Sequence, residues 1–165
     1  MVMAIAFTNT TQEQTYQRVA DYLKSSLFRD SIRLQADKPR FNLLYQDSTL
    51  IEVDVLPWDV NPWEETEMAI VRAFSYITVG NINNLELIRF LMAENHKMRF
   101  GAFQIDESGQ VVFAHNILGG DSMDLRELQT CILSVAAIAN AYEEVIIEKF
   151  GGQRVFQASE KDQAA

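Results

Sequence analysis

Few side chains in this sequence have types and spacings that could do covalent or metal chemistry. Histidine occurs only at His96 and His115, and cysteine only at Cys131. A zinc site needs three or four ligands of these types, often at HExxH or CxxC spacing, and neither pattern is present. His96 lies in a charged run that predicts an exposed helix end, and His115 lies in a strand-like run. We therefore predict no metal site, no cofactor and no catalytic site, and the sequence favours a protein that is not an enzyme.

The other candidate groups have structural explanations. Cys131 falls on the apolar stripe of a predicted helix, where a buried thiol acts as a small apolar residue. The neighbouring carboxylates of Glu64 and Glu65, and of Glu143 and Glu144, need not share a proton, because adjacent helical side chains project apart. The paired glycines at 119–120 and 151–152 lack the context of a nucleotide-binding loop and are predicted connectors.

A long strand predicted over residues 67–79 carries the clearest binding signal. Its two alternating sets of side chains are both largely apolar. One set is Ala69, Val71, Ala73, Ile77 and Val79, and the other is Met68, Ile70, Phe74 and Tyr76, interrupted by Arg72. A strand with one solvated face should alternate apolar and polar residues. The second set is therefore expected to be covered by the chain itself, by a second subunit or by a partner's peptide.

We assign the aliphatic set to the face that packs against a helix, because its smaller residues allow close approach. The register could be reversed on sequence grounds alone. With this assignment, Met68, Ile70, Phe74 and Tyr76 become the predicted partner-binding residues, and the two aromatic residues are the expected anchors. The alternative is that the first helix or a tryptophan-containing loop covers this face within the same chain.

That loop, predicted over residues 56–63, contains two prolines and both tryptophans of the chain, Trp58 and Trp63. Prolines resist regular structure. Large aromatic side chains in a loop either anchor a partner or pin the loop to its own domain. We keep Trp58 and Trp63 as candidate partner-binding residues, with the second explanation open.

The remaining elements follow from hydrophobic periodicity. Helices are predicted over residues 11–28, from Asn83 to about His96, and over 124–150, and strands over 41–45, 51–55, 67–79, 100–105 and 110–118. Thr10 with Glu13 and Asp124 with Glu127 are predicted helix caps, and Gly151 is the predicted left-handed end of the last helix. This order, α-β-β-β-α-β-β-α, predicts an α+β fold with an antiparallel sheet of about five strands, helices packed on it and a long C-terminal helix.

Size and charge limit the possible functions. The chain has 165 residues, of which 48% are hydrophobic, and a formal net charge of −9. We predict a single domain over residues 1–152, followed by a flexible tail over 153–165. The negative charge disfavours nucleic acid and anionic membrane as partners. No apolar run reaches the about 20 residues that span a bilayer, and a cytoplasmic location is expected.

Several short motifs carry a family resemblance. They are Asn95, Phe100-Gly101, Asp106-Glu107-Ser108-Gly109, the run to Leu118, and Tyr142 followed by Phe150-Gly151-Gly152. With the order of elements, they resemble YbjN-like domains and their relatives, the type III secretion chaperones. The sequence match is best over residues 83–152. The resemblance implies a small, commonly dimeric protein that holds extended segments of client proteins.

The first hypothesis is therefore a noncatalytic protein- or peptide-binding module, chaperone-like or regulatory, for which we also predict a homodimer. The second is a small-molecule or cofactor sensor with a pocket between sheet and helices, and the third is an enzyme. An open apolar second sheet face favours protein binding, whereas a closed cavity with convergent polar groups favours a small ligand.

Overall fold

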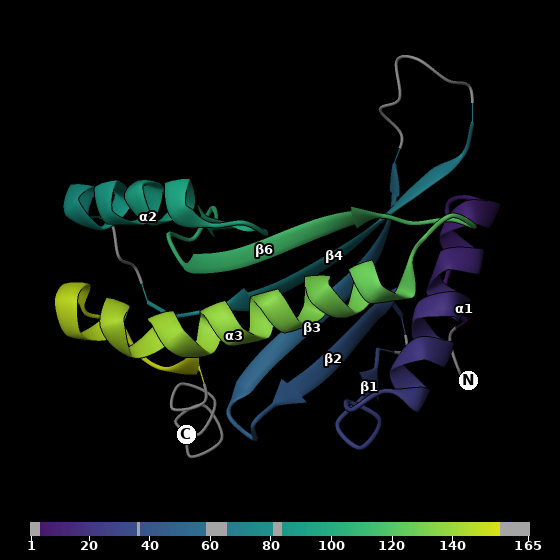
Figure 1. Cartoon of the computed structure of the whole chain (residues 1–165), viewed down its shortest axis with the longest axis horizontal. Helices are drawn as coiled ribbons and strands as arrows, with labels where there is room; N and C mark the ends of the chain where they lie inside the picture. The colour runs from purple at the N-terminus through teal and green to yellow at the C-terminus, as the bar shows by residue number, and fades with distance from the viewer. Residues whose placement is uncertain (1–3, 36, 59–65, 81–83, 156–165) are drawn as a thin grey trace.

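The computed structural model describes residues 4–35, 37–58, 66–80 and 84–155. In these residues the chain forms helices α1 (Thr10–Ser25), α2 (Leu85–Lys97) and α3 (Leu125–Phe150). The strands are β1 (Arg33–Leu34), β2 (Arg40–Tyr45), β3 (Thr49–Trp58), β4 (Met68–Tyr76), β5 (Ala102–Ile105) and β6 (Val111–Leu118). Figure 1 shows the long α3 lying across the sheet. The predicted α+β class and order of elements are confirmed.

The strands form one sheet in the order β1-β2-β3-β4-β6-β5, with every neighbouring pair antiparallel. The hairpin between β2 and β3 turns at Gln46 and Asp47, whose φ angles are +49° and +57°. Two positive φ values in succession are typical of the tight turn that matches strand twist. The sheet has six strands rather than the predicted five, because β1 contains only two residues and is too short to show a periodic pattern.

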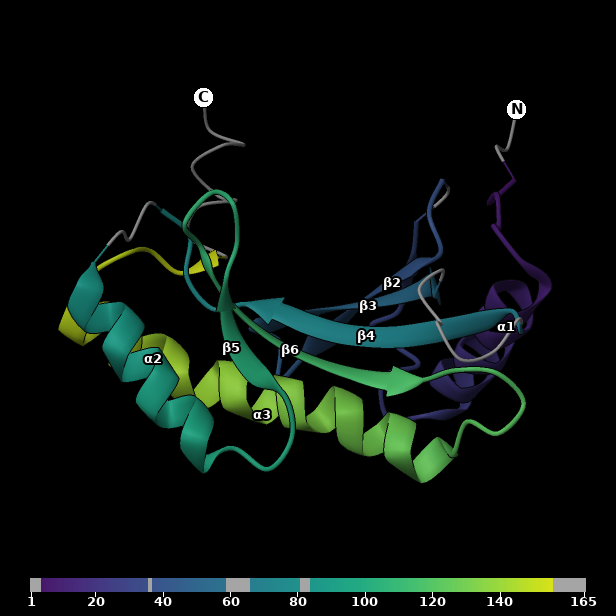
Figure 2. The ribbon, with the colours of Figure 1, turned by 90° about the horizontal axis from the view of Figure 1, so that it is seen from above.

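The helices gather on one side of the sheet (Figure 2). One continuous core lies between them and the sheet, with buried side chains from all three helices and from strands β2 to β6. Val71 and Ala73 of β4 belong to this core, together with Leu128 and Ile132 of α3. The assignment of the aliphatic set of β4 to the helix-covered face is therefore confirmed.

Helix ends follow local side-chain chemistry. Asn9, not Thr10, caps α1 by accepting a hydrogen bond from the Gln12 amide, and Asn84 rather than Asn83 is the cap of α2. The first helix also ends earlier than predicted, at Ser25, because the Ser26 hydroxyl bonds to the chain on both sides of it. The cap on α3 is Asp124, as predicted, and it accepts from two amides of the first turn.

The start of the predicted tryptophan loop is in fact strand. Leu56, Pro57 and Trp58 extend β3 and pair with β4. The proline was expected to prevent this. Strand β2, however, begins at Arg40, opposite Asp54, so β3 has a single neighbouring strand at Pro57, and such an edge position tolerates a missing N–H.

The long helix has a stripe that is buried against the sheet. By length and composition alone, α3 with its 26 residues could also cross a membrane. In the described structure, Leu128, Ile132 and Val135 are completely buried in the core. This is the environment of a core helix in a two-layer domain.

The chain after α3 returns to the sheet. Gln153 and Val79 exchange two backbone hydrogen bonds of 3.0 and 3.1 Å, and Arg154 lies 3.3 Å from Glu143. The first residues of the segment expected to be a tail therefore contact the domain. Residues 156–165 lie outside the described part of the chain.

Candidate partner-binding face of the sheet

The side of β2, β3, β4 and β6 that faces away from the helices is here called the open face. Cross-strand pairing arranges its side chains in rows. They include Arg40, Glu52, Asp54, Leu56, Trp58, Met68, Ile70, Arg72, Phe74, Tyr76, Val112, Ala114, Asn116 and Leu118. Four of the six candidate partner-binding residues, Met68, Ile70, Phe74 and Tyr76, lie on this side of β4. Ionic groups in the middle of the face divide them into two pairs.

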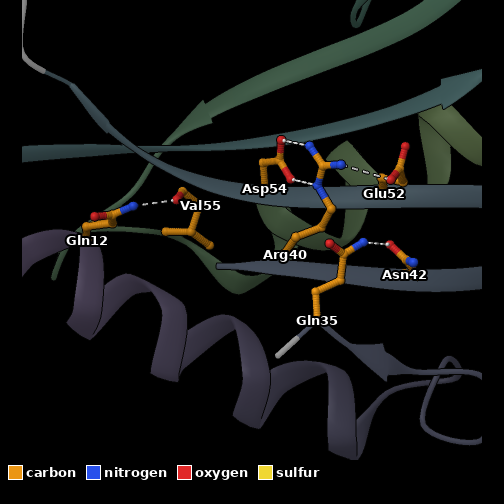
Figure 3. A network of polar contacts seen from close by, with 7 residues as sticks. All are labelled: Gln12, Gln35, Arg40, Asn42, Glu52, Asp54 and Val55. Carbon is orange, nitrogen blue, oxygen red and sulfur yellow. Dashed lines mark hydrogen bonds and ion pairs between the residues drawn. The ribbon is translucent and has the colours of Figure 1, made fainter. Parts of the chain in front are cut away.

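The ionic centre is built around Arg40 at the start of β2. Its guanidinium donates two hydrogen bonds to Asp54, one of them 2.8 Å long, and a third to Glu52 at 3.1 Å (Figure 3). The side chains are 26%, 13% and 15% exposed for Arg40, Asp54 and Glu52. The hydrogen bond that Arg40 donates to Asp54 raises the pKa of Arg40, while burial raises the pKa of Glu52. The carboxylates of Glu52 and Asp54 thus bind the same cation, the guanidinium of Arg40.

Phe74 lies beside this centre, in a small second cluster with Val112 and Ala114, against which Tyr76 packs. Phe74 is only 6% exposed, because the guanidinium groups of Arg40 and Arg72 lie 5.3 and 5.1 Å from its ring centre. Such cation–π contacts are favourable. Arginine side chains, rather than a helix or the tryptophan loop, therefore cover this end of the open face in the described structure.

The exposed apolar part of the open face is a row across three strands. Leu56 of β3, Ile70 of β4 and Leu118 of β6 are direct cross-strand neighbours. Leu56 and Leu118 are 36% and 43% exposed, and Ile70 is half-buried. The half-buried Trp58 and Met68 form the next row. Trp63 lies outside the described residues.

Arg72 separates this apolar row from Phe74. Its Nη2 donates to Gln104 Oε1 at 3.0 Å, but its Nε is buried without an acceptor. The acidic residue across the strand from it, Asp54, is held by Arg40. Within the described part of the chain Arg72 has no carboxylate partner. Its neighbour on β6 is the exposed Asn116.

Both edges of the sheet have backbone groups occupied by the chain itself. On the β5 edge, the Asn95 side chain accepts from the Phe103 amide at 2.6 Å and donates to the Phe103 carbonyl at 3.1 Å. On the other edge, where the short β1 pairs only with Phe41 and Asn42 of β2, the Leu44 amide of β2 donates to the Ser31 hydroxyl at 3.2 Å. Protected edges resist the addition of a further strand.

The histidine and cysteine positions lie on the other side of the sheet. His115 contacts Ser134 at 3.2 Å, and burial lowers the pKa of its ring. Cys131 is completely buried, and desolvation raises the pKa of its thiol to about 12. At neutral pH it is a thiol rather than a nucleophilic thiolate. Among the described residues, no group of three or more His, Cys, Asp and Glu side chains could hold a metal ion.

A partly open cavity of about 360 Å³ lies between α2 and β5. It is lined mainly by Ile88, Leu91, Met92, Phe103 and Ile105. Convergent polar groups, which fix the orientation of a small ligand, are nearly missing here, since Gln104 is the one polar side chain in its lining. This composition gives little support to a small-molecule sensor.

Leu56, Arg72 and Leu118 are among the open-face residues that sequence reasoning did not identify as site candidates. Leu56 was placed in a loop, and Arg72 was treated as an interruption of an apolar set. A usable signal exists for Leu118, because the predicted strand 110–118 places Val112, Ala114 and Leu118 on one side. Their meeting with Ile70 depends on strand order, which periodicity does not determine.

Comparison with known proteins places this architecture in a family. No curated protein matches the chain at a significant level. The family model TY-Chap1, described as T3SS (YopN, CesT) and YbjN peptide-binding chaperone 1, matches residues 13–158. The match covers both the sheet and the helices that pack on it. The chain therefore belongs to the TY-Chap1 family of YbjN-like and type III secretion chaperone-like domains.

Proposed function

We propose that this protein is a noncatalytic, cytoplasmic peptide-binding module that holds extended segments of client proteins on its open face. The observation that carries the proposal is the exposed row of Leu56, Ile70 and Leu118 on a sheet face without a helix. Membership of a family described as peptide-binding chaperones supports it. Contiguous exposed apolar side chains with a polar surround are typical of interaction sites.

The mode of binding follows from the state of the sheet edges. A client could add a strand to an edge or lay its side chains on a face. Asn95 occupies both backbone hydrogen-bonding groups of Phe103, and Ser31 occupies the amide of Leu44. Edge addition would have to break these bonds, so side-chain contact with the open face is the favoured mode.

The double variant Ile70→Asp, Leu118→Asp is expected to weaken client binding at least tenfold, about 1.4 kcal/mol. Burying a carboxylate under an apolar client segment is unfavourable. The measurement is fluorescence anisotropy with a permanently unfolded probe, a reduced and carboxymethylated small protein. Leu27→Asp is the matched control, because Leu27 is 61% exposed and lies outside the sheet. Equal binding by wild type, control and double variant, all with the same Tm, would show that the open face does not hold clients.

Homodimerisation is a second proposal, with its own surface. Leu85, Ile88 and Met92 are exposed on α2 at spacings of three and four, next to the exposed Ile105 of β5. Such a helical stripe is suited to pairing with a second copy. We expect wild type to sediment as a dimer on the order of tens of micromolar, and Met92→Asp as a monomer. A wild-type mass of one chain at that concentration would contradict the proposal.

A further inference from the structure

The open face presents its side chains in rows at a regular step. Along β4, Ile70, Arg72 and Phe74 point the same way, and each is joined across the sheet to a partner, namely Leu118, Asn116 and Ala114. Successive same-face residues of a strand are about 6.6–6.8 Å apart. An extended client segment has the same step between its alternate side chains. If a client lies along β4, two of its residues that are two positions apart therefore contact neighbouring rows. One contacts the apolar row of Ile70 and Leu118, and the other contacts the polar row of Arg72 and Asn116.

The polar row contains the guanidinium of Arg72, which no carboxylate binds in the described part of the chain. Among the described residues, the Nε of Arg72 has no acceptor, and only Gln104, a neutral side chain, accepts from its guanidinium. Asn116 beside it is exposed, and its side-chain amide has no hydrogen-bond partner in the described part of the chain. The charged acceptors of this face, Glu52 and Asp54, are bound to Arg40. Arg72 is the open-face cation that these carboxylates leave available.

We propose, resting on the function proposed above, that the open face selects client segments in which an acidic residue stands two positions from an apolar residue. The apolar side chain lies on the row of Leu56, Ile70 and Leu118, and the carboxylate accepts hydrogen bonds from Arg72 and Asn116. Arginine is suited to this role, because its planar fork binds a carboxylate through two parallel bonds. A basic client residue at this position would face a cation with no free carboxylate in reach.

The net charge of −9 does not remove this preference. At physiological ionic strength, charges more than about 8 Å apart are largely screened. The affinity for a client carboxylate therefore depends mainly on the groups in direct contact with it, Arg72 and Asn116. Contacts at the partly desolvated Arg72 are screened much less than those between distant surface charges.

The test uses synthetic peptides with Gly-Ser flanks and the fluorescence assay described above. One core is Ile-Ser-Glu-Ser-Ile, the second has Gln in place of Glu, and the third has the Glu moved one place, Ile-Glu-Ser-Ser-Ile. We expect wild type to prefer the first core over both others by at least tenfold, about 1.4 kcal/mol. In Arg72→Met this preference disappears, while binding of the Gln core stays unchanged. Arg29→Met, at a side chain that is 67% exposed in the segment after α1, is the control and keeps the preference.

Two further measurements keep the test decisive. If Arg72→Met does not fold, Arg72→Gln replaces it, because glutamine keeps a polar side chain at this position but carries no charge for a client carboxylate. Equal affinity for the Glu and Gln cores, with both lost in the Ile70→Asp, Leu118→Asp variant, would overturn the acidic preference and leave the peptide-binding function standing. Absence of binding to every peptide and to the unfolded probe would overturn both. A third outcome concerns the oligomeric state. If wild type binds no peptide and the double variant sediments at half the wild-type mass, the open face is the contact between two copies of the chain. That result would overturn both the peptide-binding function and the acidic preference.

Discussion

Gly101→Ala is expected to lower the free energy of unfolding by about 3 kcal/mol. Gly101 has a φ of +72°, a left-handed conformation that costs a residue with a Cβ about 1–2 kcal/mol. An added Cβ would also lie 2.7 Å from the Ala114 carbonyl oxygen and 2.8 Å from the Phe113 ring. Phe113 is completely buried in the core and has no space to retreat. Chemical denaturation with linear extrapolation gives the measurement.

The matched control for Gly101 is Gly120→Ala. Gly120 also has a positive φ, +89°, but the nearest atom to an added Cβ, on Thr11, is at 3.5 Å, an ordinary contact. Gly120→Ala should therefore show the cost of the backbone conformation without the steric overlap. We expect its loss of unfolding free energy to be smaller than that of Gly101→Ala by about 2 kcal/mol. Equal losses in the two variants would mean that the close approach of β6 to Gly101 contributes nothing.

Arg40→Met is expected to lower the free energy of unfolding by about 2 kcal/mol at neutral pH. The substitution removes the guanidinium that binds both Glu52 and Asp54 and that lies over the Phe74 ring. Breaking a fully buried pair costs about 3–5 kcal/mol. The smaller value applies because the Arg40 side chain is 26% exposed. Arg29→Met is the control, with an expected change within about 0.5 kcal/mol, because its ion pair with Asp30 is on the surface.

The pH dependence of the Arg40 variant has a definite sign. Burial already raises the pKa of Glu52, and Arg40 is the group that most opposes this rise. Without Arg40 the folded-state pKa of Glu52 should rise further above its unfolded value. A raised acid pKa means that stability is lost as pH rises through it and is regained as pH falls. The difference between variant and wild type should therefore shrink toward about pH 4, near the ordinary pKa of glutamate. A difference that stays constant between neutral and acidic pH would contradict the role assigned to Arg40.

Local periodicity was sufficient for most of the fold. The spacing of apolar residues identified α1, α2 and α3, and alternation in β4 separated the core set from the set that faces away from the helices. Helices and strands have different side-chain periods, and burial on one side imposes them on the sequence. The chemistry of caps was also readable from the sequence. Asp124 is the predicted cap of α3, whereas the caps of α1 and α2 shifted by one residue, because neighbouring polar side chains compete for the same amides.

The character of the open face could not be predicted in the same way. Arg40 is 12 and 14 residues away from Glu52 and Asp54, and only the hairpin register brings the three together. Phe74 was predicted to be an anchor for a partner, yet in the described structure guanidinium groups from two strands cover its ring. Long charged side chains can cross the surface of a sheet and cover an aromatic ring, and no period in the sequence records this.

The sequence by itself determined the fold class, the order of elements and the two alternating sets of side chains on β4, because these depend on residues within one helix or strand. The tertiary structure decided which side chains of different strands meet. It made one row of Leu56, Ile70 and Leu118, placed Asn95 on the backbone of Phe103 at the sheet edge, and left Arg72 beside carboxylates that another arginine already holds. The physical reason is that strand order and register are properties of the whole sheet, set by the simultaneous burial of all its strands.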